Sequence, residues 1–333
     1  MNRSVHLLLG VSVSIFALLS ACSNQSSQQV KYLAPWKVTT LASYDQPLAH
    51  EGPLHLSERE LLFFTSNRLR KPDGSPYVKV SIFDLKTGKT NDLGLSESIP
   101  MANGAFLLKD GLIAIAMQGN KKRTSGIASY NIDSGKVKII TNGFADYQFN
   151  SPNDIVQSKD RALWFTDPQY GYEEGFRPTP ALGNWVWHIT RQGDAQRLLL
   201  DGFSKPNGIA LNVDETSLFV TDTGYISGSG KRHSVLPRTI YRFKITKTEQ
   251  GLLATERTTF AIASKGIPDG IKVDRAGRVW TATGAGLEIF GSDGELLQII
   301  PFEDGVSNFA LDEEGGGAFV MGETKLYRVQ PQR

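Results

Sequence analysis

The chain has 333 residues, of which 40% are hydrophobic and 21% are charged, so it can bury a sizeable core and is not of the disordered class. Lysine and arginine number 36 against 34 aspartate and glutamate residues, and this near-balance excludes the strongly basic proteins that bind nucleic acid electrostatically. The single cysteine excludes an intrachain disulfide and a cysteine-based metal cluster, whereas 33 glycines favour many short strands joined by turns.

The N-terminal segment predicts an export signal followed by a lipid attachment site. Arg3 precedes an apolar run, residues 7–19, that is too short for a comfortable membrane span. The run ends in Leu19-Ser20-Ala21-Cys22, which resembles a bacterial lipobox; the alternative is an ordinary secretory signal with an incidental cysteine. The resemblance implies removal of residues 1–21 and lipidation of Cys22, with residues 22–35 as a polar tether. We therefore expect the protein on the periplasmic side of a bacterial envelope, held to the membrane through the lipid alone. Ser23 favours outer-membrane sorting in a Gram-negative cell.

From residue 36 onward the chain repeats one pattern, in which a polar residue after a turn is followed by a short apolar strand, a turn and a second strand. Two copies read Phe149-Asn-Ser-Pro-Asn-Asp-Ile-Val and Phe203-Ser-Lys-Pro-Asn-Gly-Ile-Ala, each continuing into an apolar run that ends in Thr-Asp. The polar residues at the six repeat starts, 39 to 62 residues apart, are Glu51, Asn103, Asn153, Asn207, Asp269 and Asn308. This period and four strand-like runs per repeat predict an all-β fold, a six-bladed β-propeller over residues 36–333.

The two ends of the repeat region predict how the ring closes. After Asn308 only about three strands fit, so the sixth blade lacks its outer strand. The run Trp36–Ala42 precedes the first repeat and can supply that strand. Such pairing removes an open sheet edge.

The repeat starts carry the chemistry, because the first strand of each propeller blade lines the central channel. The six positions hold two carboxylates and four carboxamides. Asparagine and aspartate also cap turns before strands, which explains any one of these residues but not six oxygen donors around one axis. Such a ring, without cysteine or histidine, suits a hard cation, above all Ca²⁺.

Several of these motifs identify a family. Glu51-Gly-Pro, Ser151-Pro-Asn-Asp, Lys205-Pro-Asn-Gly and Pro268-Asp-Gly resemble the SMP-30/gluconolactonase family of six-bladed propellers. Tyr170-Gly-Tyr and Asn308-Phe-Ala look most like its secreted lactonohydrolase branch, which hydrolyses aldonate or pantoyl lactones with Ca²⁺.

The resemblance implies a set of site residues. Glu51, Asn207 and Asp269 match the direct metal ligands of the family, and Asn153 matches the amide that completes the site. Asp269 would also be the general base. Family members that act on sugar lactones can carry arginine at the substrate-binding position that is Ser151 here, which puts gluconolactone itself in doubt.

The loops at the channel mouth are the expected substrate-binding elements. The long loops 66–78, 168–184 and 223–238 leave from the same mouth as the repeat starts. Tyr170 and Tyr225 are predicted to wall a small-molecule pocket, the alternative being packing between blades. Asp167 and Asp222 end paired strands, and each either faces the pocket or caps its Thr-Asp turn.

These observations predict metal-dependent hydrolysis of a small lactone. The metal would polarise the carbonyl, and a carboxylate would activate a water molecule. The absence of a Gly-x-Ser-x-Gly motif weakens the case for a serine hydrolase. Two alternatives stay open: phosphotriester hydrolysis at the same metal site, and a non-catalytic propeller that binds an envelope partner.

Overall fold

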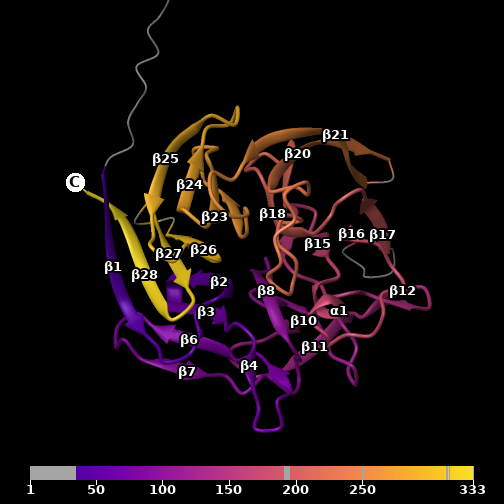
Figure 1. The fold of residues 1–333 in the computed structure, drawn as a ribbon, viewed down its shortest axis with the longest axis horizontal. Helices are drawn as coiled ribbons and strands as arrows, with labels where there is room; N and C mark the ends of the chain where they lie inside the picture. Colours follow the sequence, from indigo (N-terminus) through magenta and orange to yellow (C-terminus); the bar gives the residue numbers. More distant parts are fainter. Residues whose placement is uncertain (1–34, 191–195, 250, 313, 315, 333) are drawn as a thin grey trace, which may run out of the picture. The chain divides into compact units, whose positions relative to one another are not determined.

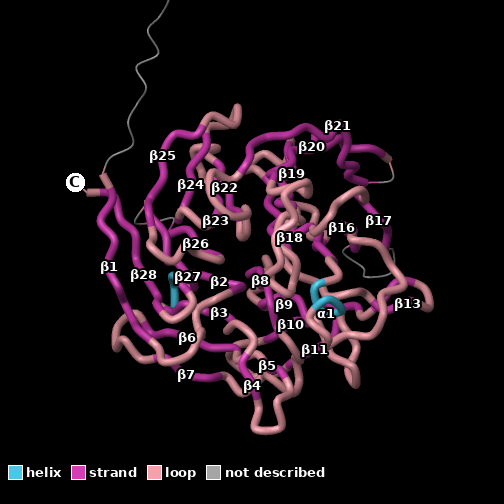
Figure 2. The backbone as a smooth tube through the Cα atoms, in the orientation of Figure 1, coloured by secondary structure: helices cyan, strands magenta, loops and turns pink. Residues whose placement is uncertain are grey.

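The computed structural model describes residues 35–190, 196–249, 251–312, 314 and 316–332. Within them, four-stranded antiparallel sheets form the six blades of a ring, which Figure 1 shows along its axis. The predicted all-β, six-bladed propeller is therefore confirmed. Figure 2 shows how little of this ring is helical: α1 (Tyr170–Glu173) and a 3-10 turn at Ser57–Arg59 stand out among strands. No helix in the described part of the chain has the length and apolar character needed to span a bilayer.

Each blade runs from an innermost strand at the channel to an outermost strand at the rim. Blade 1 consists of β2 (Glu51–Leu56), β3 (Leu61–Thr65), β6 (Val80–Asp84) and β7 (Thr90–Asp92). Blade 2 consists of β8 (Ala102–Leu107), β9 (Ile113–Met117), β10 (Gly126–Tyr130) and β11 (Val137–Thr141). Blade 3 consists of β14 (Ile155–Gln157), β15 (Leu163–Asp167), β16 (Trp185–Ile189) and β17 (Gln196–Leu200). Blade 4 consists of β18 (Pro206–Leu211), β19 (Ser217–Asp222), β20 (Thr239–Thr248) and β21 (Gly251–Ile262). Blade 5 consists of β22 (Ile271–Val273), β23 (Val279–Thr283), β24 (Gly286–Phe290) and β25 (Leu296–Pro301). Blade 6 consists of β26 (Asn308–Asp312), β27 (Gly317–Gly322), β28 (Lys325–Pro331) and β1 (Trp36–Ser43). Two small hairpins lie outside the blades: β4 (Leu69–Arg70) with β5 (Pro76–Tyr77), and β12 (Gly143–Phe144) with β13 (Tyr147–Gln148).

The ring closes through strands from opposite ends of the chain. β1 pairs antiparallel with β28, with Trp36 opposite Pro331 and Ser43 opposite Lys325. Figure 1 shows the two strands side by side, one indigo and one yellow. This confirms that the N-terminal strand supplies the outer strand of the last blade. Strand β1 ends at Ser43, one residue beyond the predicted Ala42.

The second strand of each blade is buried on both faces, which explains its unbroken apolar run. In β15 the side chains of Leu163 and Phe165 pack toward blade 2, and Trp164 packs toward blade 4. In β19 Leu218 packs toward blade 3 and Phe219 toward blade 5. Because successive side chains of a strand alternate in direction, a strand between two blades needs apolar residues at every position. The core therefore consists of apolar layers between blades, and the channel lies inside them.

Candidate metal centre and active site

The four predicted metal ligands lie at equivalent places, where inner strands begin in blades 1, 3, 4 and 5. Glu51 and Asn207 stand at the start of β2 and β18, and Asn153 and Asp269 each precede an inner strand by two residues. Glu51, Asn153 and Asn207 are buried, and Asp269 is half-buried. The repeat phase read from the sequence thus corresponds to one level of the channel.

Glycines after the repeat starts allow the inner strands to approach closely. A Cβ atom on Gly104 would lie 2.3 Å from the backbone oxygen of Asn153, and one on Gly208 would lie 2.5 Å from that of Asp269. Neither backbone oxygen can move away without shifting a strand, so any side chain at these positions is excluded sterically. The absence of a side chain at Gly104 and Gly208 therefore lets the inner strands that carry neighbouring repeat starts pack closely.

Threonines of the second strands hold the next blade's repeat start in place. The Thr166 hydroxyl donates to the Asn207 carbonyl oxygen at 2.6 Å, and the Thr221 hydroxyl donates to that of Asp269 at 3.0 Å. The Thr65 hydroxyl likewise donates to the Asn103 carbonyl oxygen of the second blade, at 3.1 Å. Each of these buried hydroxyls links one blade to the next at the level of the predicted metal ligands.

The aspartates that follow two of these threonines hold their own blades. The two carboxylate oxygens of Asp167 each accept a backbone N–H, from Asn150 and Ser151, at 2.9 Å. Asp222 accepts the N–H groups of Ser204, Lys205 and Gly224. Burial raises the pKa of Asp167 to about 7, and the amide hydrogen bonds oppose that rise. Both side chains are fully buried, so the geometry favours turn capping over contact with substrate.

The carboxyl groups of Glu51 and Asp269 both have raised pKa values. Burial, and then the charge of Asp269, raise the pKa of Glu51, although a 2.6 Å hydrogen bond from the Asn308 amide opposes the rise. Burial, and then the charge of Glu323, raise the pKa of Asp269, and a hydrogen bond from Asn207 opposes it. A buried acid and a half-buried one, neither bonded to a lysine or arginine among the described residues, favour a bound cation.

Unpartnered oxygens at the same level fit that cation. Asn153 Oδ1 and Asp269 Oδ1 are buried and accept no hydrogen bond from any group in the described chain. Such oxygens are costly to leave unpaired, and they are the donor type that Ca²⁺ prefers. Within the described residues, no group of three or more His, Cys, Asp or Glu side chains could hold a metal ion. Two of the four predicted ligands are amides, so the predicted site does not depend on such a group. The chemistry of the donor set therefore fits one hard divalent ion.

A histidine–glutamate pair beside this centre was not predicted from the sequence. His50 Nδ1 lies 2.6 Å from Glu323 Oε1, and Asn67 donates to the other carboxylate oxygen at 3.0 Å. Burial alone would lower the pKa of His50, but Glu323 outweighs it and the pKa is raised. Glu323 follows the end of β27, whereas Asp167 is itself the last residue of β15, so the repeat phase alone does not mark Glu323.

Tyr170 reaches the metal centre from α1, and Ser151 supports the loop that carries it. The Tyr170 hydroxyl is hydrogen-bonded to the Thr223 hydroxyl. Burial, with further effect from Asp269, raises the pKa of Tyr170 far above its ordinary range. The Ser151 hydroxyl is buried, donates to the Pro168 carbonyl oxygen at 2.7 Å and accepts the Gly171 N–H at 2.9 Å. Ser151 is thus engaged with the chain itself.

Acidic residues of α1 and its C-terminal neighbour join the three long loops at the mouth. Glu173 pairs with Lys205 at 2.8 Å and accepts the Gly228 N–H at 2.9 Å. Glu174 Oε2 lies 2.6 Å from Arg68 Nε. Loop 168–184 therefore contacts both loop 66–78 and loop 223–238.

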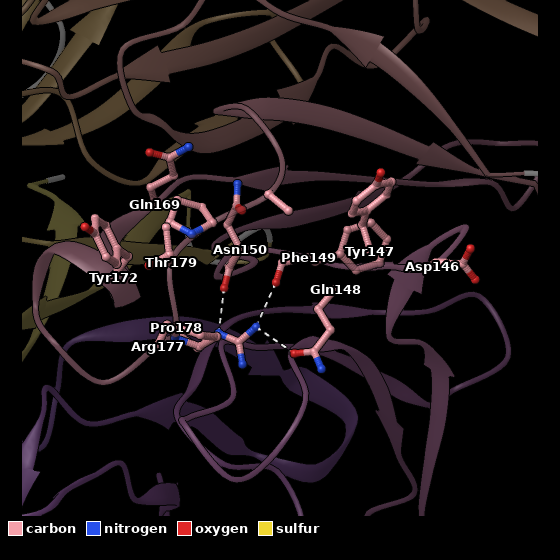
Figure 3. Close-up of a pocket in the computed structure, with 12 residues that line it drawn as sticks. Asp146, Tyr147, Gln148, Phe149, Asn150, Gln169, Tyr172, Arg177, Pro178 and Thr179 are labelled. Carbon is pink, nitrogen blue, oxygen red and sulfur yellow. Dashed lines mark hydrogen bonds between the residues drawn. The ribbon is translucent and has the colours of Figure 1, made fainter.

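Arg177, in the middle of loop 168–184, is hydrogen-bonded to the segment that precedes blade 3, as Figure 3 shows. Its buried guanidinium donates to the carbonyl oxygens of Asn150 and Phe149, both at 2.9 Å. These bonds run beside a cavity of about 230 Å³ that contains none of the predicted metal ligands. The role of Arg177 is to position the loop.

A second and larger cavity, of about 680 Å³, reaches the metal centre. Asp269 lies on its wall together with His50 and Glu323. Tyr225, predicted to wall a substrate pocket, lies on the same cavity. A cavity of this size, with convergent polar groups at one end, is suited to a small molecule.

Comparison with known proteins gives one consistent result. Residues 51–320 match the family model of the SMP-30/Gluconolactonase/LRE-like region. A gluconolactonase of Zymomonas mobilis is 30% identical over 84% of this chain and 78% of its own length, and lactonohydrolase oryL of Aspergillus oryzae is 24% identical over 79% and 63%. The solved gluconolactonase of Xanthomonas campestris superposes with a TM-score of 0.74 at 26% identity, covering 90% of this chain and 91% of its own. The chain therefore belongs to the SMP-30/gluconolactonase/LRE-like family.

Proposed function

We propose that this lactone-hydrolysing enzyme opens a small aldonate- or pantoyl-type lactone with the help of a divalent cation, Ca²⁺ above all. The observation that carries the proposal is the raised pKa of the acids Glu51 and Asp269 together with the buried, unpartnered oxygens Asn153 Oδ1 and Asp269 Oδ1. Glu51, Asn153, Asn207 and Asp269 would hold the ion. When bound, it would polarise the lactone carbonyl and stabilise negative charge on its oxygen.

We assign the proton transfer to Asp269. It lies on the wall of the large cavity, and its raised pKa brings its basicity closer to neutral pH. As the water oxygen bonds to the carbonyl carbon, Asp269 accepts the water proton. When the bond between that carbon and the ring oxygen breaks, the proton passes to the ring oxygen, which becomes the hydroxyl of the product acid.

A substrate panel tests this function. Purified protein would be assayed on gluconolactone, pantoyl lactone and a phosphotriester, each with Ca²⁺ and with a chelator. We expect hydrolysis of at least one lactone, lost on chelation and restored by Ca²⁺. Preferred cleavage of the phosphotriester would assign the alternative activity, and chelator-sensitive stability without any hydrolysis would favour a binding protein.

We further propose that the protein is a periplasmic lipoprotein, on the basis of the Leu19–Cys22 motif, which lies outside the described residues. The Cys22→Ser variant lacks the thiol that would be lipidated, so it should leave the membrane fraction or stay unprocessed. Unchanged membrane fractionation of this variant would contradict the proposal.

A further inference from the structure

The cavity that reaches the metal centre has a basic wall. Beyond Asp269 it extends along loop 223–238 and the turn after β21, where Arg232, Arg238 and Lys265 line it. We use "basic wall" for these three residues. They come from two segments that are adjacent to blades 4 and 5, and all three residues line the cavity that Asp269 also lines.

The charges of the basic wall form no ion pair within the described chain. None of its three side chains makes an ion pair or hydrogen bond there, whereas Arg68 and Lys205 at the same mouth are each paired with a glutamate. Glu303 and Asp304 also line the cavity, but neither forms an ion pair with the wall. Asp269 and Glu323 line the opposite, catalytic part of the cavity, so the cations of the basic wall offer only a local site for a negatively charged group.

The loop that carries two of these cations is organised in advance. The Tyr225 N–H donates to the Pro237 carbonyl oxygen, and the His233 N–H donates to that of Tyr225, both at 2.7 Å. The Arg238 guanidinium lies over the Tyr225 ring, 5.7 Å from its centre. A side chain held in place loses less freedom when a ligand binds, which favours its use in recognition.

We propose that the basic wall binds an anionic substituent, such as a carboxylate, carried by the lactone substrate at a distance from its ring. The inference rests on the proposed function, because it assumes that the lactone ring reacts at Asp269. The cavity, at about 680 Å³, has room for a ring and a charged substituent together. The natural substrate would then be an acidic lactone.

A matched pair of substrates tests the inference. The γ-lactones of D-glucaric and D-gluconic acid differ in that the first carries a carboxylate where the second carries a hydroxymethyl group. We expect kcat/KM to be higher for the glucaric lactone by about tenfold or more, as for a charge-assisted hydrogen bond that is open to solvent. The preference should shrink as ionic strength rises, because salt screens exposed charges.

Single variants locate the preference. Arg238→Gln and Arg232→Gln should each lower kcat/KM for the glucaric lactone by a larger factor than kcat/KM for the gluconic lactone, so that the preference shrinks. The matched control is Lys231→Gln, since Lys231 is an exposed cation of the same loop that does not line the cavity. Equal rates on both lactones, or a preference that survives both arginine substitutions, would overturn the inference.

A binding measurement separates this inference from the proposed function. Failure to hydrolyse either lactone would contradict the proposed function. The ratio of glucarate to gluconate affinity, measured by calorimetry on the wild type and Arg238→Gln, still reports on the basic wall. Tighter binding of glucarate that is lost in the variant would support the inference, and equal affinities would overturn it.

Discussion

Glu51 and Asp269 both have raised pKa values, Glu51 through burial and the charge of Asp269, and Asp269 through burial and the charge of Glu323. A protein without a cation would not favour this gathering of acids. The chain supplies partial compensation through the amides of Asn308 and Asn207. It leaves one oxygen of Asp269 and the carbonyl oxygen of the Asn153 side chain without partners. At the scale of single residues, the centre is therefore incomplete in a way that one hard cation would satisfy.

Replacing Asp269 by asparagine separates its two proposed roles. The Asp269→Asn variant keeps an oxygen of nearly the same size but loses the base and one negative charge. Affinity for Ca²⁺ should fall because charge contributes strongly to hard-cation binding. At saturating Ca²⁺, kcat should remain lower by about 10²–10⁴-fold, the usual contribution of a positioned base. Wild-type kcat under those conditions would make Asp269 a ligand only, with Glu51 the next residue to examine as base.

At the scale of elements, the repeated motif has a mechanical explanation. The glycine after a repeat start leaves space for the neighbouring strand, and the threonine of the second strand holds the next blade. The aspartate after that threonine caps the start of its own blade. Asp167 and Asp222, which the sequence alone marks as possible substrate-binding residues, thus serve to link strands within their blades.

The Gly104→Ala variant tests the close approach of the inner strands. Its Cβ would lie 2.3 Å from the Asn153 backbone oxygen, so blades 2 and 3 must move apart. We expect a loss of about 1–3 kcal/mol in the free energy of unfolding, typical of overpacking, together with weaker Ca²⁺ binding through displaced Asn153. Gly291→Ala is the control, because its nearest contact is the Asp293 side chain, which can rotate away. Equal stability of the two variants in denaturant titrations would contradict this account.

The same elements show what the sequence could predict and what it could not. The phase of the repeat placed Glu51, Asn153, Asn207 and Asp269 at one level of the channel, because a propeller repeats its geometry with its sequence. The pairing of His50 with Glu323 joins residues 273 positions apart through ring closure, and neither residue has a motif of its own. Capping by Asp167 depends on which way a turn points, and that direction is decided by packing.

At the scale of the whole molecule, the predicted metal centre and the ring closure both join blades that are distant in sequence. The predicted ligands come from blades 1, 3, 4 and 5, and Asn308 of blade 6 holds Glu51 of blade 1. β1 joins β28 at the outer rim of blade 6. A cation at the centre would therefore stabilise contacts among blades that are distant in sequence, and its removal should affect the entire ring.

This coupling predicts a pH-dependent effect of chelation on stability. Both acids have native-state pKa values raised above 4.5 for Glu51 and 3.8 for Asp269, so the metal-free native state retains protons that the unfolded chain has already lost. The free energy of unfolding of the chelated protein should consequently fall as pH rises from about 4 through neutral. Ca²⁺ binds the ionised carboxylates, so it should offset that fall.

The measurement is the difference in Tm between Ca²⁺-loaded and chelated protein, which should be small near about pH 5 and larger near about pH 8. At a free Ca²⁺ concentration a hundredfold above Kd, the loaded protein should be more stable by about 2.7 kcal/mol. A variant with both Glu51→Gln and Asp269→Asn carries no titrating acid at the centre, so its Tm difference should be small and independent of pH. A wild-type difference that stays constant across this range, or that persists in the double variant, would place the stabilising ion somewhere other than the channel mouth.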